Sequence, residues 1–231
     1  MALWKLLRSF GLHSKVVDLV EGLYTNTCSC VNVGGMMSDL FALGSGVWQG
    51  FRIAPDLFLG PMDHTMERTV LQGMTGMTSV TLGKEVFTVL DFADDVSLLA
   101  EMLEVLVLAL TVMQEEASTF GLQINWSKTI ILQVASSTCS STVQVADGHV
   151  EVVDAFVYLG CMIDSSGGSR GEVLRRIGIA WFCMNMLERS IWKSSIRLET
   201  KLRLFVPVLM YGCETWATTK YLLSRMDAFD T

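Results

Sequence analysis

The first fifty residues change from helical to strand-like spacing of their apolar side chains. Apolar positions three and four residues apart predict two short helices, residues 4–10 and 14–23, separated near Gly11. Residues 25–51 are rich in β-branched side chains and glycine, which predicts a strand or hairpin leading into an irregular loop. The beginning of the chain is therefore expected to mix helix and strand.

Two longer helices are predicted farther along the chain. The first begins near Pro55, whose fixed φ suits a first helical turn, and runs to about Leu71 with a break or kink at Gly60-Pro61. The second covers residues 103–120 and ends at Gly121, because glycine commonly terminates helices. Both helices are expected to back a sheet.

Strands are predicted between these helices. Residues 80–82 and 85–92 have strand-like composition with a turn at Gly83, and the end of the second strand can pair with residues 96–99. This pairing places Ala93-Asp94-Asp95 at the tip of a hairpin.

The C-terminal third begins with strands and ends with helices. Two strands are predicted at residues 149–153 and 156–163, after a loop of small residues at 136–141. The small residues 165–169 are the best candidate for a subdomain boundary, and two or three helices follow them.

Composition and the N-terminus favour an intracellular protein. Apolar residues make up 51% of the 231 residues, but the most apolar stretch, residues 96–113, contains Glu101 and Glu104. Each charge at the centre of a bilayer would cost about 2.5–3.5 kcal/mol, so no membrane span is expected. The N-terminus lacks the apolar region and cleavage site of a signal peptide, which favours the cytoplasm or nucleus over secretion.

Charge is distributed unevenly along the chain. The formal net charge is −7, which opposes binding to a phosphate backbone. However, residues 1–168 carry a net charge of −11, whereas residues 169–231 carry +4. A nucleic-acid contact is therefore expected toward the C-terminus.

Asp94 and Asp95 are the strongest candidates for chemistry. Adjacent carboxylates repel each other, and no lysine or arginine occurs between Lys84 and Lys128 to offset them. A bound Mg²⁺ or Mn²⁺ is the simplest counter-charge, because these ions prefer oxygen ligands. A solvated Asp-Asp turn without any metal is an equally simple interpretation of these residues alone.

Several sequence blocks, in order along the chain, resemble reverse transcriptases of the non-LTR retrotransposon kind. Phe92-Ala93-Asp94-Asp95 is similar to the family's aromatic-Ala-Asp-Asp box, and residues 45–58 resemble the block that lines its nucleotide and template pocket. Residues 120–129 are similar to its Gly-Leu-x-Ile-Asn-x-x-Lys-Thr segment. Phe156-Val157-Tyr158-Leu159-Gly160 resembles its primer-supporting turn, and residues 211–216 resemble a region after the palm.

The resemblance implies an RNA-directed DNA polymerase. It implies an α+β palm remnant, an antiparallel sheet backed by helices, with partial fingers and palm in residues 1–164 and a helical thumb-like segment in residues 165–231. The implied substrates are an RNA template, a DNA primer and dNTPs, joined by phosphoryl transfer at Mg²⁺ or Mn²⁺.

The same resemblance implies roles for individual residues. Asp94 and Asp95 would bind the metal, and Lys128 would protonate the leaving pyrophosphate, although a lone lysine in a turn is more often a surface charge. The remaining implied contacts are with the nucleotide or template by Gln49, Gly50, Pro55 and Phe92, and with the primer end by Tyr158, Leu159 and Gly160.

Departures from the family pattern suggest degeneration. Trp48, Phe51, Ala54 and Leu59 replace the usual arginine, cysteine, serine and asparagine, so polar groups are lost where a triphosphate should bind. The family's earlier catalytic aspartate would lie just before Met1. Weak or absent activity is therefore expected for the isolated chain.

Two alternatives remain open at this point. Basic residues from Arg170 onward, above all Arg175 and Arg176, could follow a nucleic-acid backbone in a non-catalytic binding module, or could form an ordinary solvated helix face. The high apolar content also allows a membrane-associated or aggregation-prone fragment.

Overall fold

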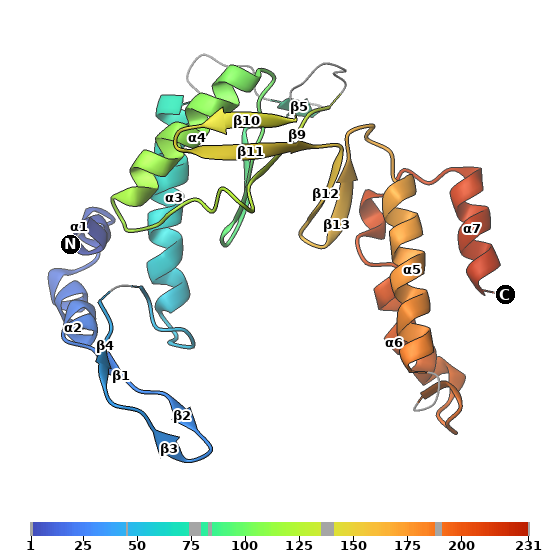
Figure 1. Cartoon of the computed structure of the whole chain (residues 1–231), viewed down its shortest axis with the longest axis horizontal. Coiled ribbons are helices and arrows are strands. Elements are labelled where there is room, and N and C mark those ends of the chain that lie inside the picture. Colours follow the sequence, from blue (N-terminus) through green and yellow to red (C-terminus); the bar gives the residue numbers. More distant parts are fainter. Residues whose placement is uncertain are drawn as a thin grey trace. The chain divides into compact units, whose positions relative to one another are not determined.

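The computed structural model describes residues 2–44, 46–73, 80–82, 85–134, 141–187 and 191–230 (Figure 1). The chain divides into two compact units. The first contains residues 1–126 together with 144–148, and the second contains residues 127–143 together with 149–231. The boundary expected between residues 164 and 165 concerns subdomains of the family and stays a prediction.

The first unit begins with two short helices, as predicted. Helix α1 (Ala2–Ser9) and helix α2 (Ser14–Tyr24) are joined by a turn in which Gly11 has a φ of 84°. The Nδ1 atom of His13 accepts a hydrogen bond from the Lys15 backbone N–H at 3.2 Å and so caps α2. Leu7 of α1 and Val17 of α2 are buried together and begin the core of this unit.

A ribbon of short antiparallel strands follows these helices. Strand β1 (Cys28–Ser29) pairs with β4 (Phe41–Ala42), and β2 (Asn32–Val33) pairs with β3 (Met36–Met37) nearer the tip (Figure 1). The predicted hairpin is therefore confirmed.

The two long helices of the first unit pack against each other. Helix α3 (Ala54–Gly73) continues through Pro61, so the chain does not break there, and it contacts helix α4 (Leu103–Ser118). Thr65, Thr69 and Ala109 are completely buried, and side chains of this size allow two helices to approach closely. Gly121, with a φ of 77°, follows the end of α4 as predicted.

Two hairpins lie between these helices in the sequence. Strand β5 (Val80–Leu82) pairs with β6 (Glu85–Phe87), and β7 (Val89–Phe92) pairs with β8 (Asp95–Leu98). The strand predicted at residues 85–92 is therefore divided at Thr88, because its two halves pair with different partners.

A mixed sheet and another hairpin follow helix α4 in the sequence. Strands β10 (Thr142–Val145), β11 (Gly148–Val153) and β9 (Ile130–Leu132) form a sheet in that order, and β11 runs parallel to β9. Strand β12 (Ala155–Tyr158) pairs antiparallel with β13 (Cys161–Asp164).

These strands correct two expectations. The single strand predicted at residues 156–163 is the hairpin β12–β13, because the chain reverses at Leu159-Gly160. The antiparallel palm sheet expected as one unit consists, among the described residues, of separate hairpins and a sheet with a parallel pair. The small-residue loop predicted at 136–141 lies almost entirely outside the described residues.

The predicted helical end of the chain is confirmed. Helix α5 (Arg170–Met186) contacts strand β13, helix α6 (Leu198–Leu209) and helix α7 (Lys220–Asp230). A short 3₁₀ helix, Cys213–Thr215, lies between α6 and α7 in the sequence. In the part of the chain that the structure describes, no helix has the length and apolar character needed to cross a bilayer. The observed mixture of helices and small sheets agrees with an α+β protein.

Candidate functional site

Asp94 and Asp95 lie at the end of a regular hairpin, as predicted. Strands β7 and β8 pair from Val89 opposite Leu98 to Phe92 opposite Asp95, which leaves Ala93 and Asp94 as the two turn residues. Ala93 has a φ of 56°, a left-handed conformation that is uncommon for residues other than glycine.

The tip of this hairpin is open to solvent. The Phe92 side chain is 66% exposed, and Asp94 and Asp95 are exposed as well. Within the described residues, the Asp94 carboxylate has no hydrogen-bond or ion-pair partner. The three residues therefore present an aromatic ring and two carboxylates to the surroundings.

The two carboxylates fit part of a magnesium site. Mg²⁺ is usually bound by one or two carboxylates together with water and substrate phosphates. Among the described residues, no group of three or more His, Cys, Asp or Glu side chains is placed to hold a metal. Asp94 and Asp95 could therefore contribute two oxygen ligands, with the others coming from outside these residues.

The block resembling a nucleotide pocket lies before and at the start of α3. Gln49 and Gly50 are exposed in a turn, where Gly50 has a φ of 86°, and Pro55 is exposed in the first turn of the helix. Their predicted contacts with nucleotide or template stay predictions.

The aromatic departures from the family pattern have partners in the first unit. The Trp48 ring lies 5.0 Å from the Tyr24 ring and 5.6 Å from the Phe51 ring, between centroids. Tyr24 also lies 6.1 Å from the ring of Trp4. Such separations are typical of favourable aromatic pairs. Trp48 and Phe51 therefore belong to an aromatic cluster that joins the start of α1, the end of α2 and the approach to α3.

Lys128 is exposed, in a turn of the second unit, whereas the acidic hairpin belongs to the first unit. Its role as proton donor stays a prediction.

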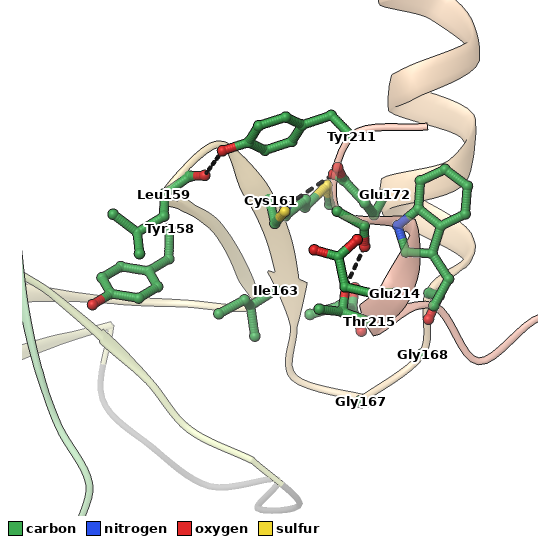
Figure 2. A pocket seen from close by; sticks show the side chains of 15 residues that line it. Tyr158, Leu159, Cys161, Ile163, Gly167, Gly168, Glu172, Tyr211, Glu214 and Thr215 are labelled. Carbon is green, nitrogen blue, oxygen red and sulfur yellow. Dashed lines mark hydrogen bonds between the residues drawn. The ribbon is translucent and has the colours of Figure 1, made fainter. Parts of the chain in front are cut away.

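The turn predicted to support a primer is the tip of hairpin β12–β13. Tyr158 pairs with Cys161, and the two residues between them, Leu159 and Gly160, have φ values of 47° and 81°. Positive φ at both central positions is the conformation of a tight two-residue hairpin turn. Figure 2 shows this turn beside a pocket of about 580 Å³.

The two arginines predicted to contact a nucleic-acid backbone have partners within the protein, and their nucleic-acid role stays a prediction. Arg175 donates to Glu172 at 2.8 Å and to the Gly160 carbonyl oxygen at 2.5 Å. Arg176, which is buried, donates to Glu172 at 2.7 Å and to the same Gly160 carbonyl oxygen. The structure thus joins two predicted sites, the turn and the arginines, which sequence reasoning treated separately.

Tyr211 completes this arrangement from a distant part of the chain. Its hydroxyl donates to the Leu159 carbonyl oxygen at 2.9 Å (Figure 2), and the Arg176 guanidinium lies 4.4 Å from its ring centroid. A Cβ atom on Gly160 would come within 3.3 Å of the ring, so this position requires close approach as well as positive φ.

Glu172 is the central acceptor of the cluster and is only 3% exposed. Its carboxylate also accepts the Met162 backbone N–H at 2.8 Å. Burial opposes ionisation, but the hydrogen bonds from Arg175, Arg176 and Met162 outweigh it and hold the pKa of the Glu172 carboxyl below its ordinary value. The buried carboxylate is therefore ionised and paired at neutral pH.

Sequence reasoning assigned no such role to Glu172 or Tyr211. Glu172 lies three and four residues before the two arginines, a spacing that brings helical side chains together and could have indicated the ion pairs. Tyr211 is 52 residues from Leu159, and no local pattern indicates their contact.

The pocket beside the turn is lined by the hairpin β12–β13 and by the segment that follows α6. Its walls include Tyr158, Cys161, Tyr211, Glu214 and Trp216. The Trp216 Nε1 atom is buried and has no hydrogen-bond partner among the described residues. The surface of this pocket is mainly apolar.

Comparison with known proteins identifies the family. A family model described as reverse transcriptase (RNA-dependent DNA polymerase) matches residues 2–163, which is more than half of the chain. The chain belongs to the reverse transcriptase family. This match includes the acidic hairpin and the turn at Leu159-Gly160.

Similar proteins come from transposable elements. A transposon-derived protein of Caenorhabditis elegans, F52C9.6, is 32% identical over 150 residues, which are 60% of this chain and 52% of that protein. The Pol polyprotein of the type-1 retrotransposable element R2 of Popillia japonica is 25% identical over 96% of this chain and 32% of its own length.

A third relative is the Pol polyprotein of the type-2 element R2DM of Drosophila melanogaster. It is 28% identical over 55% of this chain and 12% of its own length. The chain thus spans about half of the worm protein and smaller fractions of the two polyproteins. These relatives support the resemblance to non-LTR retrotransposon reverse transcriptases.

Proposed function

We propose that this chain is the metal-binding and primer-supporting part of an RNA-directed DNA polymerase, with weak activity or none as an isolated chain. The observation that carries the proposal is the exposed pair Asp94 and Asp95 at a hairpin tip within the region that the family model matches. Helices α3 and α4 with this hairpin would be the palm remnant, and α5 to α7 would be the thumb-like segment.

The chemistry would be nucleotidyl transfer on an RNA template: the primer 3′-hydroxyl would attack the α-phosphate of a dNTP, and pyrophosphate would leave. Asp94 and Asp95 would hold Mg²⁺ or Mn²⁺, which when bound neutralises charge that develops on the phosphate oxygens. The protein itself would mainly position the reactants, with Gln49, Gly50 and Phe92 near the nucleotide. The expected location is the cytoplasm or nucleus.

Weak activity is proposed because the nucleotide block is altered. Trp48 and Phe51 pack against Tyr24, so their rings contribute to a hydrophobic cluster instead of supplying donors to a triphosphate. Phosphoryl transfer depends on positioning and charge stabilisation, and both are reduced when a positive side chain is lost.

Primer extension on poly(A) with oligo(dT) tests the proposal. The chain should extend the primer slowly or not at all in Mg²⁺ or Mn²⁺, and Asp94→Ala should reduce any extension by about a hundredfold or more. Asp91→Ala is a matched control, because Asp91 is an exposed aspartate on the same hairpin. Its extension should equal that of the wild type.

Mn²⁺ binding, followed by electron paramagnetic resonance, covers the case in which extension is undetectable. Asp94→Ala should weaken Mn²⁺ binding, whereas Asp91→Ala should not. Extension that survives Asp94→Ala, or Mn²⁺ binding unaffected by it, would contradict the proposed metal site. Rapid extension by the wild type would contradict the proposed degeneration.

The alternative function is a non-catalytic nucleic-acid-binding module. The excess of basic residues after residue 168 favours it, although Arg175, Arg176 and Lys201 have protein partners. Arg197, Lys220 and Arg225 are exposed and have no ion-pair or side-chain hydrogen-bond partner in the described part of the chain. Reversing these three charges should weaken binding and lower its salt dependence if this function is correct.

A further inference from the structure

We propose that the cluster beside the Leu159-Gly160 turn positions this turn for a primer 3′ end. The cluster, called the turn clamp, consists of Glu172, Arg175, Arg176 and Tyr211. The inference rests on the proposed function, because it assumes that the turn meets a primer. It adds positioning residues, which contact the turn and need not touch the nucleic acid.

The turn clamp holds both backbone carbonyl groups at the tip. The Leu159 carbonyl oxygen accepts the Tyr211 hydroxyl, and the Gly160 carbonyl oxygen accepts both Arg175 and Arg176. Hydrogen bonds from a charged donor are roughly twice as strong as bonds between neutral groups. A turn held at two consecutive carbonyls has little freedom to rotate its peptide groups.

The turn also needs such support, because its backbone conformation is unfavourable for one of its residues. Leu159 has a φ of 47°, and this left-handed conformation is unfavourable for residues other than glycine. Strained conformations persist where the surrounding structure determines them strongly. The side chains of the turn clamp, which come from α5 and from the segment after α6, hold the turn in this conformation.

Glu172 connects the clamp to the fold of the second unit. Its buried carboxylate pairs with both arginines and also accepts the Met162 N–H of strand β13. One carboxylate therefore joins helix α5 to the hairpin and fixes the arginines that reach its tip. The tip should move with α5 instead of moving independently.

The clamp leaves side chains at the tip available for a ligand. The Leu159 side chain is partly exposed, and Figure 2 shows it on the opposite side of its carbonyl group from Tyr211. The clamp uses backbone oxygen atoms of the turn, whereas a primer terminus would meet the outward side chains. The turn clamp thus fixes the backbone of the turn and leaves its outward side chains free to contact a primer.

Tyr211→Phe in the full chain tests the inference. It removes the hydroxyl that binds Leu159 and retains the ring beneath Arg176, and Tyr211 is half exposed, so the fold should persist. Tyr221→Phe is the matched control. Tyr221 is equally exposed and lies near the Arg170 guanidinium, but its hydroxyl has no hydrogen-bond partner among the described residues.

Fluorescence anisotropy at low salt measures the affinity of the protein for two RNA–DNA hybrids. One hybrid has a recessed primer 3′ end, and the other has the same sequence with blunt ends. The wild type should prefer the recessed end. Tyr211→Phe should lower this preference about three- to tenfold, the effect expected for one net hydrogen bond. Tyr221→Phe should leave the preference unchanged.

Three outcomes would overturn the inference and remain distinguishable. A wild type that binds both hybrids equally would refute the primer-supporting role itself, together with the inference. A preference that is present in the wild type and unchanged in Tyr211→Phe would refute only the clamp. If Tyr211→Phe weakened binding to both hybrids equally, the Tyr211 hydroxyl would have only a structural role. Faster amide exchange at residues 158–162 in Tyr211→Phe should accompany the expected result.

Discussion

Hairpins β7–β8 and β12–β13 both end in two-residue turns, but the surroundings of the two turns differ. The Ala93-Asp94 turn is exposed, and the Asp94 carboxylate has no partner in the described part of the chain. In the Leu159-Gly160 turn, both carbonyl oxygens accept side-chain hydrogen bonds. The first turn offers charge to a ligand, whereas the second has its shape fixed by the protein.

The difference follows from where the positive charges lie. No lysine or arginine occurs between Lys84 and Lys128, so the first hairpin has no basic neighbour in its own stretch of sequence. The second hairpin is followed by α5, which carries Arg175 and Arg176 beside Glu172. The local supply of counter-charge thus leaves one turn open and negatively charged, whereas the backbone of the other is held by side chains.

The largest expected effect is the loss of the clamp's buried carboxylate. Glu172→Gln leaves the buried Arg176 without its counter-charge, which should lower the free energy of unfolding by about 3–5 kcal/mol. Glu199→Gln is the matched control, because the Glu199–Arg203 pair has the same helical spacing but is 76% and 78% exposed. That change should cost about 0.5 kcal/mol or less. Urea denaturation measures both, and equal effects would contradict the clamp.

The difference in the free energy of unfolding between the wild type and Glu172→Gln should depend on pH. The pKa of Glu172 is held below its ordinary value of 4.5 in the folded chain, so its stabilising effect is complete above pH 4.5. This stabilising effect is lost as the pH falls through the lowered pKa. The Glu172 carboxyl of the unfolded chain binds a proton at a higher pH than that of the folded chain, so acidification favours unfolding. The difference in stability between the wild type and Glu172→Gln should therefore shrink below pH 4.5. A difference that grows on acidification would contradict this.

A smaller effect is expected from a methyl group at the clamped turn. Gly160→Ala adds a Cβ at a φ of 81° and within 3.3 Å of the Tyr211 ring. Gly121→Ala adds one at a φ of 77° with no atom within 4 Å. The second should cost about 1 kcal/mol from backbone strain alone, and the first about 2 kcal/mol, because Tyr211 must also move. Equal costs in urea denaturation would mean that Tyr211 adjusts freely.

The smallest effect is expected at the open turn. Asp94→Asn removes one of two adjacent negative charges without removing any partner in the described residues. Exposed substitutions of this kind usually change stability by at most about 0.5 kcal/mol, and relief of repulsion favours a slight gain. Thermal denaturation at low salt measures it. A loss of 1 kcal/mol or more would show that Asp94 has a structural role.

The acidic hairpin was predictable because its signals are local. The strand-like composition on both sides of Ala93-Asp94-Asp95 predicts two strands, and the structure pairs them from Val89 opposite Leu98. The hairpin β12–β13 was predicted as one strand, because residues 156–163 are apolar almost throughout and their reversal depends on Leu159 adopting positive φ. A non-glycine residue gives little local indication of that conformation.

The roles of Trp48 and Phe51 in the altered nucleotide block depend on contacts that the sequence pattern does not show. Trp48 and Phe51 were predicted only as losses of polar groups from a binding site. The structure shows a gain as well, because both rings pack near Tyr24 in the first unit. Whether an aromatic replacement is a defect or a packing residue depends on side chains that are distant in sequence.

The sequence by itself determined the family, the α+β mixture of elements and the position of Asp94 and Asp95 at a hairpin tip, because each follows from short-range order along the chain. Only the tertiary structure decided what Arg175, Arg176 and Tyr211 do. The ion pairs of Glu172 follow from helical spacing, but their burial depends on which surfaces pack together, and so does the contact between Tyr211 and Leu159 across 52 residues. Packing brings distant residues close enough for charge and hydrogen bonding to act, and no local spacing specifies it.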